Sequence, residues 1–128
     1  MKYHAAVAAE LLGSEELVAN SLSNLESCAL PENEKAMLRF VGNVNLDAPS
    51  ITAQDMEPLY QMGWTDEAIY SAISVCALFN FYNRWIDATG VHPMSEEAHR
   101  KFGKGTANNG YIHRLNDHPG ILATQGRL

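Results

Sequence analysis

The longest continuous pattern of apolar positions lies in residues 63–91, GWTDEAIYSAISVCALFNFYNRWIDATGV. Thr65 stands directly before two acidic residues, as at a helix start, where a side-chain oxygen caps free N–H groups and the helix dipole favours negative charge. Gly90 stands where a left-handed residue ends a helix. Because apolar residues occupy most of the circumference between these ends, the pattern predicts a long central helix that other helices surround.

A polar stripe interrupts this apolar helix. Five residues share one side of it at helical spacing: Cys76, Asn80, Asn83, Arg84 and Asp87. Polar groups on a buried helix need hydrogen-bond partners unless they are there for chemistry. We favour a buried polar network in which Arg84 pairs with Asp87 or with an acidic residue of another helix. The alternatives are a substrate site and an interface between subunits.

The rest of the chain predicts shorter helices and no strand. Apolar residues at helical spacing, together with turn and cap residues, define five of them: residues 2–12, 14–22, 31–41, 52–62 and 95–102. Thr52 and Asp55 have the spacing of a capping box. The predicted fold class is therefore all-α.

The sequence changes character at Gly103, where it becomes rich in Gly and Asn. Beyond that point the chain carries scattered apolar anchors: Tyr111, Ile112, Leu115, Ile121 and Leu122. We expect a helical domain over residues 1–102 and an irregular C-terminal tail over residues 103–128, packed on the domain or on a neighbouring subunit.

Composition narrows the class of protein. The 128 residues are 46% hydrophobic, enough for one domain with a core, and the net charge of −6 without a Lys/Arg cluster argues against nucleic acid. We find neither an apolar run long enough to span a membrane nor the features of a signal peptide. These features predict a cytoplasmic protein with reduced thiols, without a cofactor and without nucleic-acid or membrane partners.

Single cysteines and histidines offer limited chemistry. Cys28 and Cys76 are too far apart in sequence to form a redox or metal pair by spacing. We interpret Cys76 as a small buried hydrophobe, with a redox thiol as the alternative, and expect Cys28, near a loop, to be exposed. Four histidines lack the spacing of a metal site and are interpreted as solvated loop residues: His92, His99, His113 and His118.

Several segments carry a family resemblance: LRF at residues 38–40, GWTDEAI at residues 63–69, FNFYNRWIDATGV at residues 79–91, and the opening YHAAVAAELLG at residues 3–13. Together they resemble the carboxymuconolactone decarboxylase/AhpD-like superfamily, and more narrowly its peroxidase-related branch. The likeness covers residues 2–93. It implies an AhpD-like helical bundle that forms oligomers.

The peroxidases of that family use a Cys-x-x-Cys-x-x-x-His motif, with a Glu earlier in the chain as proton relay. Two thiols one turn apart can form a disulfide, while the His and Glu help to make the thiolate that attacks the peroxide. His4 matches the motif's histidine, and the second cysteine would fall one residue before Met1. The resemblance therefore implies a bundle truncated at its N-terminus, either because the start was assigned at an internal Met or because the lineage has lost the site.

The second half of the chain does not repeat this motif. When the family's Glu is placed at Glu67, the two cysteine positions fall on Phe79 and Tyr82, and the histidine position falls on Ile86. The resemblance there supports the fold and not a second active site.

Three functions remain open. The first is an antioxidant, thiol-dependent peroxidase acting on organic hydroperoxides with a thiol reductant, in which His4 takes part and Cys76 is a weaker candidate. The second is a decarboxylase-like enzyme that binds a carboxylate through side chains such as His4, Asn80 or Arg84. The third is a non-catalytic helical oligomer. In each case we expect a homo-oligomer, a dimer or larger, with residues 2–12 and the tail at the contact, since an exposed apolar helix needs cover.

Overall fold

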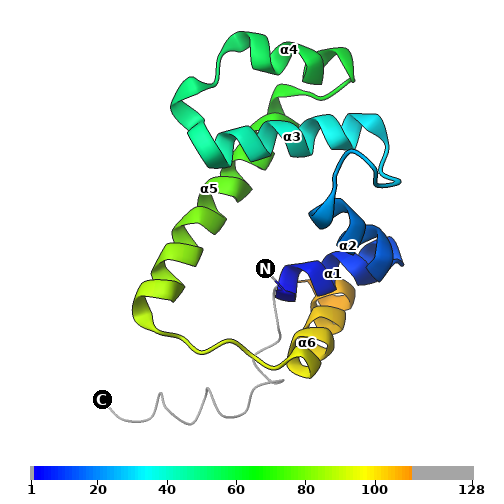
Figure 1. Cartoon of the computed structure of the whole chain (residues 1–128), viewed down its shortest axis with the longest axis vertical. Helices are drawn as coiled ribbons and strands as arrows, with labels where there is room; N and C mark the ends of the chain where they lie inside the picture. Colours follow the sequence, from blue (N-terminus) through cyan, green and yellow to red (C-terminus); the bar gives the residue numbers. More distant parts are fainter. Residues whose placement is uncertain (1, 111–128) are drawn as a thin grey trace. The chain divides into compact units, whose positions relative to one another are not determined.

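The computed structural model describes residues 2–110, and every regular element in that range is helical (Figure 1). The elements are α1 (Lys2–Leu12), α2 (Glu15–Ser23), α3 (Glu32–Asp47), the 3-10 helix η1 (Ala48–Ser50), α4 (Ala53–Gln61), α5 (Asp66–Thr89) and α6 (Glu96–Asn109). The all-α prediction is confirmed for these residues. The apolar anchors predicted from Tyr111 onward lie outside the described residues.

The chain divides into two compact units, which we describe separately. One unit joins Met1–Ala19 to Met94–Leu128, so its described part is α1, the start of α2 and α6. The other unit, Asn20–Pro93, contains α3, η1, α4 and α5.

The core of the Asn20–Pro93 unit forms where α3, α4 and the first half of α5 meet. Leu59 of α4 and Ile69 of α5 are each 1% exposed, against Ala36, Met37 and Phe40 of α3. Full burial of one aliphatic side chain stabilises a fold by about 1.5–3 kcal/mol, so these contacts dominate the stability of the unit.

The helix ends follow the predicted capping chemistry. The Thr52 hydroxyl and the Thr52 backbone N–H donate to Asp55 Oδ2, over 2.7 and 2.8 Å, and these bonds hold the pKa of Asp55 below its usual value. At the start of α5 the Thr65 hydroxyl accepts from the N–H of Ala68 over 3.2 Å. Gly90 ends α5 with a φ of 68°, in the left-handed region that favours glycine.

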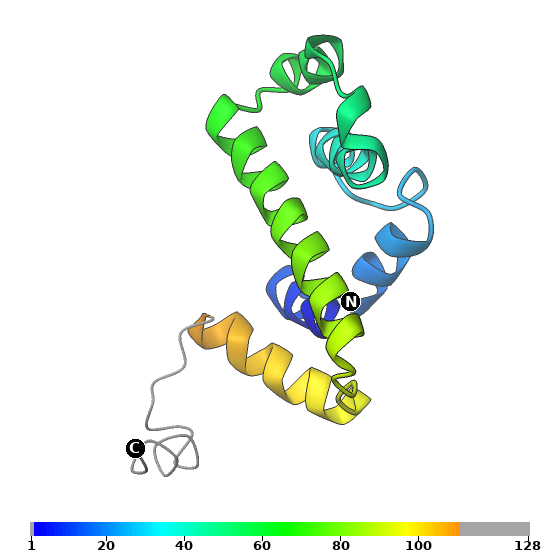
Figure 2. The ribbon, with the colours of Figure 1, turned by 90° about the vertical axis from the view of Figure 1, so that its left-hand side faces the viewer.

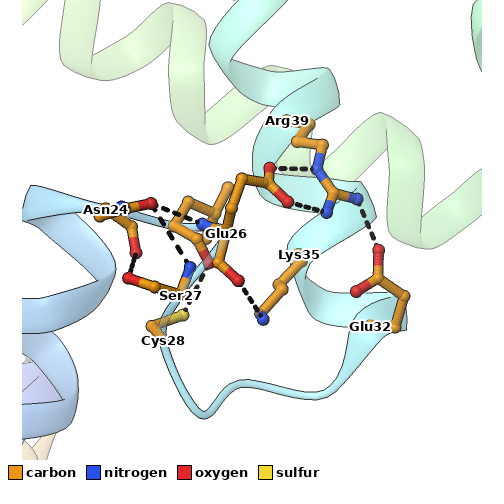
Figure 3. A network of polar contacts seen from close by, with 8 residues as sticks. Asn24, Glu26, Ser27, Cys28, Glu32, Lys35 and Arg39 are labelled. Atoms are coloured by element: carbon orange, nitrogen blue, oxygen red, sulfur yellow. Dashed lines mark hydrogen bonds and ion pairs between the residues drawn. The ribbon is translucent and has the colours of Figure 1, made fainter.

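The segment between α2 and α3 is held against α3 by an exposed polar network (Figure 3). Arg39 donates from Nε and Nη2 to the two carboxylate oxygens of Glu26, over 2.6 and 2.5 Å, and from Nη1 to Glu32 over 2.8 Å. These hydrogen bonds from Arg39 lower the pKa of the Glu26 carboxyl. Lys35 adds a hydrogen bond of 3.0 Å to the backbone carbonyl of Glu26.

This folded segment buries Cys28, which is only 5% exposed (Figure 3). Its thiol donates to the carbonyl of Leu25 over 3.0 Å. The prediction that Cys28 is exposed is therefore wrong, because Arg39 draws the segment back onto α3 instead of leaving it as an open loop.

In the other unit, α6 lies along α1 (Figure 1). The hydroxyls of Tyr3 and Thr106 are hydrogen-bonded, and Thr106 is buried. A Cβ on Gly103 would lie 2.8 Å from the Cβ of Ala6, so the absence of a side chain allows the two helices to approach this closely.

The predicted end of the last helix at residue 102 is wrong, because α6 continues to Asn109. Glycine lowers the intrinsic helix propensity of this stretch, but the close packing of Gly103 on α1 compensates for that loss. The boundary predicted between residues 102 and 103 consequently falls inside a helix.

Within its own unit, α5 is not surrounded by other helices, contrary to the prediction. The core of its unit contains no described residue of α5 beyond Ile73, and every residue from position 81 to position 90 is exposed. α3 packs on one side of α5, where its contacts reach as far as Asn80 (Figure 2). Within residues 2–110 no helix is both long and apolar enough to cross a membrane.

Candidate functional site

An open pocket of about 440 Å³ lies between the last turn of α3, η1 and the middle of α5. Apolar side chains such as Val44, Ile73 and Ala77 line part of it. Its polar groups come from both helices: Asn45, Asp47, Cys76, Asn80 and Arg84. Part of the predicted polar stripe of α5 therefore lines a pocket.

Asn80 is the centre of the hydrogen bonds in this pocket. Its Nδ2 donates to Asn45 Oδ1 over 2.7 Å and to the carbonyl of Cys76 over 3.1 Å, with the Cys76 sulfur 3.6 Å away. The Cys76 thiol in turn lies 3.9 Å from the carbonyl of Val41, to which it donates. Asn80 thus links α5 to α3 and fixes the position of its own side-chain oxygen.

Arg84 is hydrogen-bonded to the side-chain oxygen of Asn80. Its Nη1 donates to Asn80 Oδ1 over 2.8 Å and to the Asn80 carbonyl over 3.0 Å. No acceptor among residues 2–110 lies within hydrogen-bond reach of its Nε or Nη2. Among the described residues the guanidinium is therefore held at Nη1 alone, and Arg84 is one of the residues that line the pocket.

The favoured prediction of a buried polar network is wrong. Cys76 and Asn80 are half-buried, whereas Asn83, Arg84 and Asp87 are exposed, and no ion pair joins Arg84 to Asp87 in the described residues. The physical reason is that α3 ends at Asp47, close to Asn80, so its unit provides no helix to cover the later turns of α5.

Asn45 takes part in the site although sequence reasoning did not identify it. It lies near the end of α3 and its partner Asn80 is 35 positions further along the chain. No short motif marks such a pair. The only available signal was that Asn80, on the core-facing side of a helix, required an amide or carbonyl partner.

His4 belongs to the unit of α1 and α6 and lies in the first turn of α1. It is half-buried, and burial lowers the pKa of its imidazole below the usual value. The rings of His4 and Tyr3 are nearly perpendicular, at 81°, with the ring centroids 5.0 Å apart. Burial therefore favours the neutral form of the imidazole.

The histidines predicted to be solvated lie in different settings. His92 is exposed, whereas His99 lies in α6, half-buried, with Nδ1 buried and without a partner in the described residues, so the prediction is wrong for His99. His113 and His118 lie outside the described range. Among residues 2–110 no three His, Cys, Asp or Glu side chains are grouped to hold a metal ion.

The fold defines an all-helical protein over its described residues. Comparison with known proteins finds no matching family model, no matching curated protein and no matching solved structure. A function for this chain can therefore be inferred only from its own residues and from the family that its sequence resembles.

Proposed function

We propose that this chain is a peroxidase-related, AhpD-like protein that takes part, as a homo-oligomer, in the reduction of organic hydroperoxides. The observation that carries the proposal is His4, which matches the motif histidine and whose half-buried imidazole has a lowered pKa. A neutral imidazole one turn after a thiol can take up the proton that the thiol must lose. The all-helical fold is consistent with the resemblance.

The proposed reaction balances with a dithiol as reductant. A thiolate attacks one peroxide oxygen, the O–O bond breaks, and the alkoxide leaves with a proton as alcohol. The resulting sulfenic acid condenses with the second thiol to a disulfide and releases water. An external dithiol then reduces that disulfide and becomes oxidised. His4 would accept the proton of the attacking thiol.

The chain itself should show no thiol-dependent hydroperoxidase activity above background. Its 128 residues contain no Cys-x-x-Cys, and Cys28 and Cys76 are both free, with Cys28 buried. With dithiothreitol and cumene hydroperoxide, we expect the rate to equal that of the buffer, and Cys76→Ser to leave it unchanged. A dithiothreitol-dependent rate that Cys76→Ser removes would instead identify Cys76 as the nucleophile.

The pocket favours a second candidate function, the decarboxylase-like binding of a carboxylate. Arg84 Nε and Nη2 lack acceptors among the described residues, and a guanidinium binds a carboxylate through two parallel hydrogen bonds. Asn80 and Asn45 support the guanidinium, and the apolar wall suits the hydrocarbon part of a small ligand. Asp47, at the same pocket, would disfavour a ligand with several negative charges.

Replacing Arg84 with alanine tests the second candidate function, the binding of a carboxylate. Because Arg84 is exposed and, among residues 2–110, hydrogen-bonded only to Asn80, we expect the melting temperature to stay within about 2 °C. If the second candidate holds, Arg84→Ala weakens the binding of benzoate, a ligand with a single carboxylate, measured by titration calorimetry. Arg100→Ala, which removes the same charge from an exposed position of α6, leaves binding unchanged. Equal binding by wild type and Arg84→Ala excludes the carboxylate site.

The experiment that tests the hydroperoxide proposal adds the thiol pair in the required register. A Cys-Ala-Ala-Cys segment joined directly before Met1 places the second cysteine four positions before His4. The dithiothreitol-dependent reduction of cumene hydroperoxide by this protein then reports whether His4 assists the thiol.

A further inference from the structure

One side of α5 carries large apolar side chains that are 39–74% exposed: Tyr70, Val75, Leu78, Phe81, Tyr82, Trp85 and Ile86. We call these seven residues the α5 stripe. From Val75 to Ile86 they recur three and four positions apart, and Tyr70 lies five positions before Val75, so all seven share one side of the helix. This side points away from Ile69, Ile73 and Cys76, which face α3.

The α5 stripe is free of charge. The charged residues of α5 between Tyr70 and Thr89 are Arg84 and Asp87, which belong to the side that carries Asn80. Ser74 and Thr89 lie among the stripe residues, but their hydroxyls donate to the carbonyls of Tyr70 and Trp85 of the same helix, each over 2.8 Å. Covering the stripe would therefore leave these two donors satisfied.

The exposed apolar area of the α5 stripe is close to the area that one partner buries in a stable protein–protein contact. From the exposed fractions, the seven side chains present roughly 700 Å², since a large aromatic side chain alone carries about 150–250 Å². A stable protein–protein contact buries about 800 Å² on each partner, whereas the largest apolar patch on a monomer is typically about 300–600 Å². The α5 stripe thus exceeds what an uncovered monomer normally exposes.

We propose that the α5 stripe packs against the α5 stripe of a second copy of this chain, with the two helices antiparallel about a two-fold axis near Leu78. A two-fold contact brings the same patch together from both copies, so it needs only one self-complementary surface. Antiparallel helices also place opposite dipole ends side by side.

The residue order suits this register. With Leu78 on the axis, Trp85 of one copy lies opposite Ser71 of the other, and Tyr82 lies opposite Ser74. Each large aromatic side chain thereby meets a small residue, which allows the surfaces to interdigitate. Val75 and Phe81 face each other as apolar partners. A charged or polar partner would not match a stripe without charge.

The α5 stripe would form the contact of the proposed homo-oligomer, and this contact does not depend on the hydroperoxide chemistry. Residues 2–12, which were predicted to form the contact, would then lie outside it. Absence of peroxidase activity in a dimer would count against the reaction alone, and activity in a monomer would count against the contact alone.

The test is the molar mass in solution at micromolar concentration, by light scattering and sedimentation. We expect a dimer or a multiple of it for the wild type, and a dissociation constant roughly a hundredfold higher for Trp85→Glu, because the new carboxylate would be buried in the contact. Asn83→Glu, which adds the same charge on the polar side of α5, should leave the dimer intact. A wild-type monomer, or an unchanged dimer in Trp85→Glu, overturns the proposal.

A cross-link tests the register even if Trp85→Glu fails to fold. In a variant without Cys28 and Cys76, Leu78→Cys should join two copies by a disulfide under mild oxidation, because only the residue on the axis meets itself. Asn83→Cys is the control and should remain uncross-linked. A wild-type monomer in which Trp85 is shielded from acrylamide quenching would show that the chain's own residues cover the stripe, which also overturns the proposal.

Discussion

Replacing Gly103 with alanine is expected to destabilise the α1–α6 pair by about 1–3 kcal/mol, the usual cost of inserting a methyl group into a tight contact. The new Cβ would lie 2.8 Å from Ala6 Cβ and 3.2 Å from the backbone of Ala6 and Val7. Since two of these three atoms belong to the α1 backbone, a side-chain rotation cannot relieve the clash, and α6 has to move away from α1.

Gly105→Ala is the matched control, two positions further along α6. A Cβ there would meet nothing within 4 Å, so the substitution should stabilise the helix by about 0.5–1 kcal/mol through the propensity of alanine. Hydrogen exchange of the α1 and α6 amides measures both effects. We expect faster exchange in Gly103→Ala and slower exchange in Gly105→Ala, with α3 unchanged. Equal exchange in the two variants would refute the close approach at Gly103.

The helix ends could be predicted from sequence because their chemistry is local. The cap of Thr65, the capping pair of Thr52 and Asp55, and the left-handed glycine at position 90 each involve residues within a few positions of one another. Such contacts depend on the spacing of residue types, which the sequence displays directly.

The burial of α5 could not be predicted in the same way. Its apolar circumference indicates that it needs cover but not where that cover comes from, and α3 ends at Asp47 before it reaches the later turns. Similarly, the helix propensity around Gly103 predicts an early end to α6, whereas the long-range contact with Ala6 maintains the helix.

The pocket was predicted only in part, for the same reason. Asn80 and Arg84 share a side of α5 by periodicity, but Asn45 enters through tertiary packing. The burial of the two cysteines could not be predicted from the sequence either. Cys28, expected to be exposed, is buried in the segment that Arg39 and Lys35 bind to α3, and Cys76, expected to be buried, is half-buried at the pocket.

The largest expected effect on activity is at His4 in the protein that carries Cys-Ala-Ala-Cys before Met1. General acid–base assistance typically contributes about 10²–10⁴ in rate, so His4→Gln should lower the rate of hydroperoxide reduction by about a hundredfold. The half-buried imidazole of His4 is the group to which we assign this role, and glutamine keeps the size but cannot accept the proton. His92→Gln, at an exposed position, should leave the rate unchanged.

The dithiothreitol-dependent rate of cumene hydroperoxide reduction, compared between the Cys-Ala-Ala-Cys protein and its Ala-Ala-Ala-Ala counterpart, tests the proposed function most directly. The proposal predicts a rate well above background for the first protein, a background rate for the second, and the loss of most of the gain in His4→Gln. Equal rates in the two proteins, or a gain that survives His4→Gln, would contradict it.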